Sequence, residues 1–115
     1  MSYVDGFVLP VKKANLEAYR AQARLGGQIW MEHGATAYLE SIGDDVPYGE
    51  LTSFPRAVQA QDDEVVVLSW VVYADRATRD AVMAKVMADE RLKGQDMPFD
   101  ATRMIFGGFE AFVEH

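Results

Sequence analysis

The most regular hydrophobic pattern of the chain lies in residues 64–73, where both alternating faces are apolar. The two faces consist of Val66, Leu68, Trp70 and Val72, and of Val65, Val67, Val71 and Tyr73. Only Ser69 interrupts this pattern. A β-branched run with two apolar faces is typical of a strand that is covered on both sides. We therefore expect residues 64–73 to form a central strand of a sheet.

Alternation predicts three further strands. Residues 3–11 are largely apolar on both faces and predict a second interior strand, with Pro10 ending the pairing because proline has no N–H to donate. Residues 35–42 have mixed polarity, which favours an edge strand or a lined cavity. Residues 102–113 predict the last strand, with Ile105, Gly107 and Phe109 on its apolar face.

A period of three to four residues predicts two helices. The first spans residues 13–33, and its apolar stripe consists of Leu16, Tyr19, Ala23, Gly26, Gly27 and Trp30. A glycine inside a helix costs about 1 kcal/mol relative to alanine. Gly26 and Gly27 therefore indicate either a break or close packing against the sheet, and we favour close packing. Asp75 is expected to cap the second helix, which runs to about Ala88.

The remaining segments carry weaker signals. Residues 43–53 are dense in turn-forming residues and predict a loop. In residues 54–61, Pro55 argues against an interior strand, although residues 57–60 could form a short one. Residues 89–101 are expected to be irregular, because Gly94 and Pro98 interrupt them.

The predicted order is strand, helix, strand, strand, helix, strand within one domain, residues 1–115. This order is typical of the ferredoxin-like α+β fold, a βαββαβ antiparallel sheet with two helices on one face. The other face would still carry large apolar side chains, which is unusual for a monomer. A second copy packed on that face would give a homodimeric α+β barrel, and the pattern leaves open which face this is.

The amino-acid composition disfavours or excludes several classes of function for this chain. The net charge is −7, with 11 basic and 18 acidic residues, which disfavours binding to nucleic acids or to anionic membrane surfaces. The chain has no cysteine, which excludes disulfides and thiol nucleophiles. It contains no signal-peptide pattern and no apolar run of about 20 residues that could span a bilayer. We expect a cytoplasmic protein without a bound metal or cofactor.

Few polar residues suggest chemistry. His33 and His115 are the only histidines, and neither belongs to a cluster with metal-ligand spacing. Asp44 and Asp45 could start a turn or belong to a functional loop over a cavity mouth. Arg103 could pair with the nearby Asp100, or its guanidinium could bind the carboxylate of a ligand.

Aromatic residues supply the strongest candidates for a binding site. The candidate pocket residues are Trp30, Tyr38, Glu40, Trp70, Tyr73, Arg103 and Phe106. They could fill the core or the dimer interface, or they could line an apolar pocket between sheet and helices, with Glu40, Tyr38 and Arg103 as polar contacts. Several methionines would make such an interior adaptable: Met83, Met87, Met97 and Met104.

Motifs spread over nearly the whole chain support this interpretation. They lie at residues 3–8, 43–47, 69–70, 97–100 and 103–110. Together they resemble the YbaA-like family of small bacterial proteins of unknown function. The resemblance implies a dimeric α+β barrel and no particular activity, although this wider superfamily includes cofactor-independent monooxygenases. Three hypotheses remain: a dimer that binds a small apolar or aromatic molecule, a cofactor-independent monooxygenase, and a structural dimer without a ligand.

Overall fold

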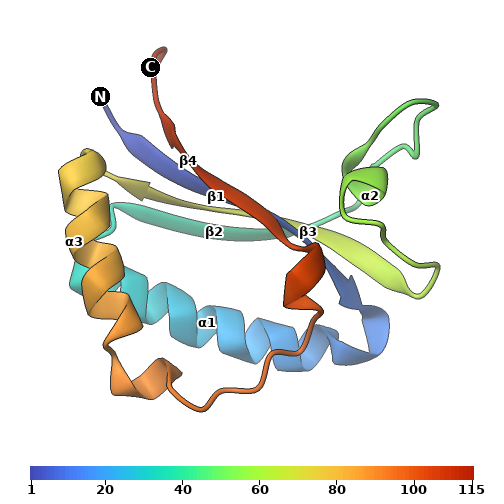
Figure 1. The fold of residues 1–115 in the computed structure, drawn as a ribbon, viewed down its shortest axis with the longest axis horizontal. Coiled ribbons are helices and arrows are strands. Elements are labelled where there is room, and N and C mark those ends of the chain that lie inside the picture. Colours follow the sequence, from blue (N-terminus) through green and yellow to red (C-terminus); the bar gives the residue numbers. More distant parts are fainter.

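The computed structural model describes residues 1–115 as a four-stranded antiparallel sheet with two long helices on one face (Figure 1). The strands are β1 (Tyr3–Lys12), β2 (Ala37–Ile42), β3 (Glu64–Tyr73) and β4 (Ile105–Glu110). The long helices are α1 (Leu16–His33) and α3 (Arg76–Met87). A single turn of helix forms α2 (Phe54–Ala57), and 3-10 turns lie at Lys13–Asn15, Glu90–Leu92 and Ala101–Arg103. The strand order β2-β3-β1-β4 confirms the predicted ferredoxin-like α+β fold.

The two strands with two apolar faces are the two central strands. β1 and β3 pair over their full lengths, from Tyr3 opposite Tyr73 to Lys12 opposite Glu64. Pairing therefore continues past Pro10, so the expectation that this proline ends it was wrong. The pairing of β1 with β4 reaches only to Val8, so at Pro10 the strand has one neighbour instead of two. A missing N–H is tolerated at such an edge-like position.

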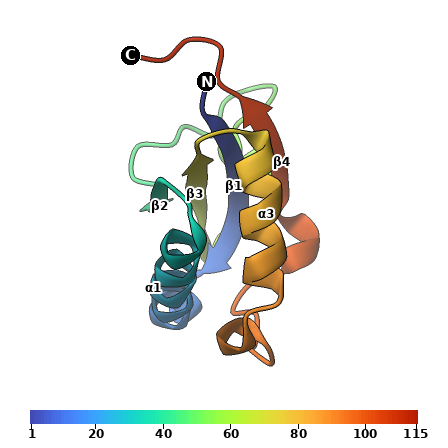
Figure 2. The ribbon, with the colours of Figure 1, turned by 90° about the vertical axis from the view of Figure 1, so that its left-hand side faces the viewer.

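Figure 2 shows α1 on the β2 side of the sheet and α3 on the β4 side. Alternate residues of each strand point to opposite faces, of which these helices cover one. Odd-numbered residues of β3 face the helices, and Val67, Ser69, Val71 and Tyr73 are all buried. The opposite face carries Val4, Val8, Leu68, Trp70 and Val72 at partial exposure. At its two edges, Leu39 is 44%, Ile105 46% and Phe109 64% exposed. The open face is thus the even-numbered face of β3.

Most of the hydrophobic core lies between the sheet and the two helices. One cluster consists of Tyr3, Ile29, Ala35, Val71, Tyr73, Val82 and Val86. A smaller cluster of Leu9, Val11 and Val67 continues it toward the other end of α1. α1 continues without a break through Gly26 and Gly27, where the ring of Tyr38 packs against the helix. A Cβ atom on Gly27 would lie 2.9 Å from Cδ1 of Tyr38, which confirms the close-packing prediction.

The structure confirms the predicted cap of the second helix and corrects two other predictions. Oδ1 of Asp75 accepts a hydrogen bond from the backbone N–H of Thr78 at 2.7 Å, which starts α3 as predicted. Residues 54–61 contain the short helix α2 and no strand, because the Ser53 side chain caps the Arg56 N–H and proline suits a first helical turn. β4 is shorter than the predicted strand, because Ala101–Arg103 is a 3-10 turn capped by Asp100.

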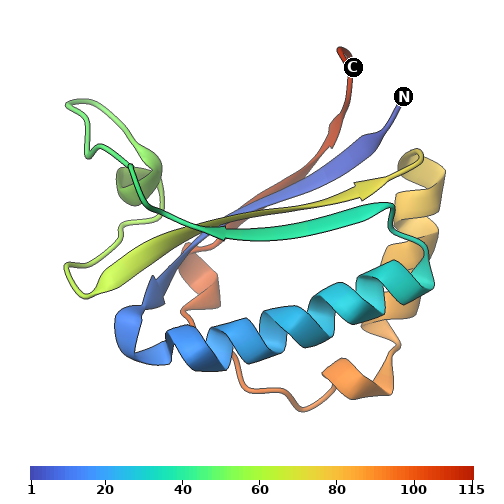
Figure 3. The same ribbon diagram turned by 180° about the vertical axis from the view of Figure 1, so that it is seen from behind.

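Residues 43–53 contain no helix or strand, which confirms the predicted loop. Figure 3 shows this loop and α2 projecting beyond the sheet, on the side away from α1 and α3. None of the helices is both long and apolar enough to cross a membrane.

Candidate functional site

A cavity of about 350 Å³ lies between the covered face of the sheet and the two helices. Its floor is formed by side chains of β1, β2 and β3, among them Phe7, Glu40 and Ser69. Its walls come from α1, from α3 and from the chain after α3, and most of the lining residues are hydrophobic. Met87, Met97 and Met104 line it as predicted, whereas Met83, the fourth methionine of that prediction, does not.

The irregular segment between α3 and β4 forms one wall of this cavity. Two side chains hold the segment in place. Asn15, at the end of the 3-10 turn before α1, donates a hydrogen bond to the carbonyl of Pro98 at 3.4 Å, and Gln22 of α1 donates one to the carbonyl of Asp96 at 3.3 Å. Phe99 packs edge-on against Tyr19 with ring centroids 5.7 Å apart. Because the lining residues Lys93, Gln95 and Met97 are exposed, the cavity opens to solvent along this segment.

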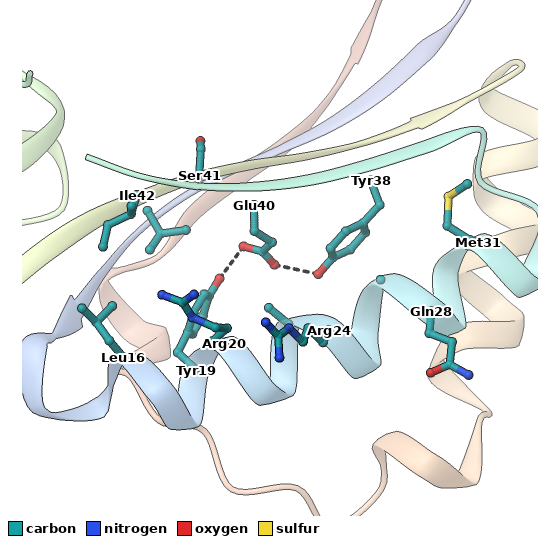
Figure 4. A pocket seen from close by; sticks show the side chains of 13 residues that line it. Leu16, Tyr19, Arg20, Arg24, Gln28, Met31, Tyr38, Glu40, Ser41 and Ile42 are labelled. Atoms are coloured by element: carbon teal, nitrogen blue, oxygen red, sulfur yellow. Dashed lines mark hydrogen bonds between the residues drawn. The ribbon is translucent and has the colours of Figure 1, made fainter. Parts of the chain in front are cut away.

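Glu40 lines the cavity, and Figure 4 shows its carboxylate held by two tyrosines. Tyr38 and Glu40 are alternate residues of β2, so both side chains point toward α1. Tyr38 donates its hydroxyl to Oε2 of Glu40, and Tyr19 of α1 donates to Oε1, both at 2.6 Å. Burial, followed by the hydrogen bond to Glu40, raises the pKa of Tyr19 and of Tyr38. Both phenols therefore remain protonated donors at neutral pH.

A second hollow of about 640 Å³ runs along the outer side of α1 and the edge strand β2 (Figure 4). It shares Tyr19, Ala23, Tyr38 and Glu40 with the cavity, so the hydrogen-bonded tyrosines lie between the two spaces. Many of its other side chains, such as Arg20, Arg24 and Met31, are exposed. The cavity, whose walls include buried core residues, is therefore the better candidate for a ligand site.

A chain of polar side chains crosses the core beside the cavity. Trp30 Nε1 donates to the hydroxyl oxygen of Tyr73 at 3.1 Å, and Tyr73 donates to Oδ2 of Asp5 at 2.9 Å. Burial, followed by the hydrogen bond to Asp5, raises the pKa of Tyr73. Arg79 Nε lies 3.2 Å from Oδ1 of Asp5 but forms no aligned hydrogen bond, so charge attraction holds this pair. This chain connects α1, β3, β1 and α3.

The structure brings three of the predicted pocket residues together. Trp30, Tyr38 and Glu40 all line the cavity. Tyr73 is adjacent but fully buried, and its hydroxyl contacts Trp30 and Asp5 instead of the cavity.

Trp70, Phe106 and Arg103 do not line the cavity, which corrects their placement as pocket candidates. Trp70 lies on the open face, opposite Leu39 and Gly6, because it is an even-numbered residue of β3. Phe106 is 73% exposed and stacks on Phe7, which belongs to the cavity floor.

Arg103 forms a structural ion pair. Its Nη1 and Nη2 atoms donate to the two carboxylate oxygens of Glu64 at 2.8 and 2.7 Å, and Nε donates to Oδ2 of Asp100 at 3.0 Å. The predicted pair with Asp100 is therefore present. Glu64 occupies the paired guanidinium N–H groups of Arg103 that could have bound a ligand's carboxylate. These hydrogen bonds lower the pKa of the Glu64 carboxyl.

The other candidate residues lie outside the cavity. Asp44 and Asp45 line a separate hollow of about 210 Å³ with Val46 and Leu68, so their loop does not cover the cavity mouth. His33 connects the end of α1 to the segment just after α3, with Nε2 2.9 Å from Oδ2 of Asp89. Hydrogen bonds from Arg91 and then from His33 lower the pKa of Asp89.

Tyr19 and Ser69 line the cavity but were not among the predicted candidates. Tyr19 belonged to the predicted helix stripe, and nothing in the sequence indicated that its hydroxyl would contact Glu40. The sequence did point to Ser69, because it is the one polar residue that interrupts the apolar pattern of residues 64–73.

Comparison with known proteins places the chain in a family. The uncharacterized protein YbaA of Escherichia coli K12 is 44% identical over 116 residues, covering 99% of both chains, and YbaA of Shigella flexneri matches equally well. A solved structure described as a dimeric ferredoxin-like protein from an uncultured marine organism has a TM-score of 0.62 and covers all of both chains. Its 9% identity shows that the fold alone is shared. Residues 2–101 match the family described as "Protein of unknown function (DUF1428)", and the chain belongs to this family.

Proposed function

We propose that the protein is a homodimer in which each chain binds one small, mostly apolar molecule between sheet and helices. The observation that carries this proposal is the cavity of about 350 Å³ with hydrophobic walls and one carboxylate. Protein interiors are close-packed, with few voids larger than a water molecule. Ligand pockets typically measure about 300–1,000 Å³ and combine apolar walls with a few polar groups. The cavity counts against the hypothesis of a structural dimer whose core is completely filled.

The open face of the sheet supports the dimer. Its central part consists of Val4, Val8, Leu68, Trp70 and Val72, without a charged side chain. Large exposed apolar patches are unusual on monomers and mark interaction surfaces. The similar solved protein is described as dimeric. Two sheets packed face to face would cover this surface and leave the helices, and hence the cavity, on the outside.

Ligand binding can be tested with a matched pair of variants of α1. Ala23 lines the cavity, whereas Ala21 is exposed on the same helix. Wild type should bind naphthalene or 2-naphthol at one molecule per chain in equilibrium dialysis. Ala23→Phe should abolish this binding because the ring fills the cavity, and Ala21→Phe should preserve it. If wild type binds neither probe, or if Ala23→Phe binds as well as wild type, the proposed site is incorrect. Oxygen uptake with bound 2-naphthol would favour the monooxygenase alternative.

The dimer can be tested by sedimentation equilibrium. Wild type should have twice the 12.8 kDa mass of one chain at micromolar concentration. Val72→Lys should yield a folded monomer, since an ammonium buried in an apolar interface costs several kcal/mol, whereas a lysine on a free surface does not. Ala84→Lys, on the exposed side of α3, is the control and should remain dimeric. A wild-type monomer would refute the dimer.

A further inference from the structure

We propose that the cavity selects molecules that carry a hydroxyl group, which is bound on the sheet between Ser69 and Glu40. This inference rests on the proposed function, because it identifies the chemical class of the molecule that the cavity binds. It concerns recognition only and requires no chemical step.

Ser69 is a buried polar residue that points into the cavity. It lies on the helix-facing side of β3, is 6% exposed and lines the cavity floor. Its hydroxyl takes part in none of the side-chain hydrogen bonds of the chain, which include those of the neighbouring Glu40. Arg79 Nε is the only fully enclosed side-chain nitrogen or oxygen without a hydrogen-bond partner. The unpaired oxygen of Ser69 is therefore not fully enclosed and retains accessible surface. Buried hydroxyl groups normally have a hydrogen-bond partner, and here the cavity is the place for one.

Glu40 lies directly opposite Ser69 on the neighbouring strand. Side chains in directly opposed positions have Cβ atoms about 5 Å apart, so one small group can contact both. A carboxylate can accept about four hydrogen bonds, and those from Tyr19 and Tyr38 use two of them. Glu40 therefore keeps acceptor capacity for a ligand, while the two tyrosines fix its position.

A hydroxyl group matches this pair better than other polar groups do. It can donate its proton to Glu40 and accept the proton of Ser69 at the same oxygen. A ligand carboxylate would place a second negative charge against Glu40, and Lys93, the cation at the mouth, is already paired with Glu90 at 3.0 Å. An ammonium group could donate to Glu40 and to the Ser69 oxygen, but it would offer no acceptor for the Ser69 proton and would lose its hydration in the apolar cavity. A carbonyl or ether group would leave Glu40 without a donor.

The other lining residues of the cavity indicate what kind of apolar molecule carries this hydroxyl. Phe7, Trp30 and Phe99 are aromatic lining residues of the cavity, and Met87, Met97 and Met104 also line it. An apolar cavity of about 150 Å³ binds benzene. A cavity of about 350 Å³ therefore has room for a bicyclic aromatic body with its hydroxyl on the sheet.

Four probes that share one aromatic body test this inference: naphthalene, 2-naphthol, 2-naphthoate and 2-naphthylmethylamine. Equilibrium dialysis at neutral pH should show 2-naphthol binding roughly tenfold more tightly than naphthalene, because it gains two hydrogen bonds. The naphthoate and the amine should both bind more weakly than 2-naphthol. Ser69→Ala should reduce 2-naphthol affinity roughly fivefold and leave naphthalene affinity unchanged, which also shows that the variant is folded.

Ser41→Ala is the matched control, because Ser41 belongs to the same sheet but does not line the cavity. It should bind all four probes as wild type does. Equal affinity of wild type for 2-naphthol and naphthalene would overturn hydroxyl selection while leaving the proposed cavity site intact. Tighter binding of the amine or the naphthoate, or unchanged binding by Ser69→Ala, would overturn it as well. If no probe binds at all, the proposed function itself fails.

Discussion

Asp5 should contribute far more to stability than Asp80, although both carboxylates contact Arg79. Asp5 is 7% exposed in the middle of β1, where Oδ1 lies 3.2 Å from Arg79 Nε and Oδ2 accepts from Tyr73. Asp5→Asn preserves the size of the side chain and an oxygen for Tyr73. It removes the negative charge beside Arg79 and turns an amide NH₂, which cannot accept a hydrogen bond, toward the guanidinium.

The magnitude follows from the burial of the two partners. Removing one partner of a buried ion pair costs about 3–5 kcal/mol. The Arg79 side chain is 22% exposed and keeps Asp80 at 2.9 Å, so part of this cost is avoided. We expect Asp5→Asn to lower the free energy of unfolding by about 2–3 kcal/mol. The Asp80 side chain is 56% exposed, and Asp80→Asn should lower the free energy of unfolding by less than about 1 kcal/mol.

Urea unfolding followed by circular dichroism provides the assay. All variants must be compared at one protein concentration, because the stability of the proposed dimer would depend on concentration. The midpoint should shift while the slope of the free energy with urea stays constant, which indicates a change in stability alone. Equal losses in Asp5→Asn and Asp80→Asn would refute the reasoning, because burial would then not determine the contribution of the charge.

Two further predictions concern the tyrosines and the glycine contact. The raised pKa values of Tyr19, Tyr38 and Tyr73 stabilise the folded chain below pH 10.0, the ordinary tyrosine value. Above pH 10.0 these tyrosines ionise in the unfolded chain before they ionise in the folded chain, so the free energy of unfolding should fall by at most about 1.4 kcal/mol per pH unit for each tyrosine. Urea unfolding that shows no such decline above pH 10.0 would contradict this prediction. Gly27→Ala, whose Cβ would lie 2.9 Å from the Tyr38 ring, should lose about 1 kcal/mol in thermal unfolding despite its better helix propensity. Gly26→Ala should change less, and a stabilised Gly27→Ala would contradict the contact.

The sequence predicted the fold because its strongest patterns are local. The two strands that are apolar on both faces are the central ones, and Asp75 caps α3. The prediction failed where two signals competed. Pro55 was interpreted as a residue that disfavours a strand, but together with the Ser53 cap it starts a short helix.

The end of β4 shows a limit of periodicity. Apolar alternation continues to Val113, whereas β4 ends at Glu110. β1, its neighbour in the sheet, begins at Tyr3, and Tyr3 pairs with Glu110. The length of a strand therefore depends on its partner, which no pattern within the strand reveals.

The candidate site was predicted only in part, for a related reason. Alternation shows that Trp70 and Tyr73 lie on opposite faces, but it does not show which face the helices cover. Arg103 pairs with Glu64, which lies 39 positions away in the sequence, and spacing within the sequence cannot predict a contact at that separation. The pairing of Ser69 with Glu40 likewise depends on the register between β2 and β3.

The position of β1 in the sheet has a consequence for synthesis of the protein. β1 is made first, but its partners β3 and β4 lie far along the chain, and Tyr3 pairs with both Tyr73 and Glu110. Until β4 has been made, one edge of β1 presents free backbone groups between two apolar faces, which promotes pairing between chains. Contacts of such sequence separation also form slowly. The nascent chain therefore remains prone to aggregation until its last strand joins the sheet.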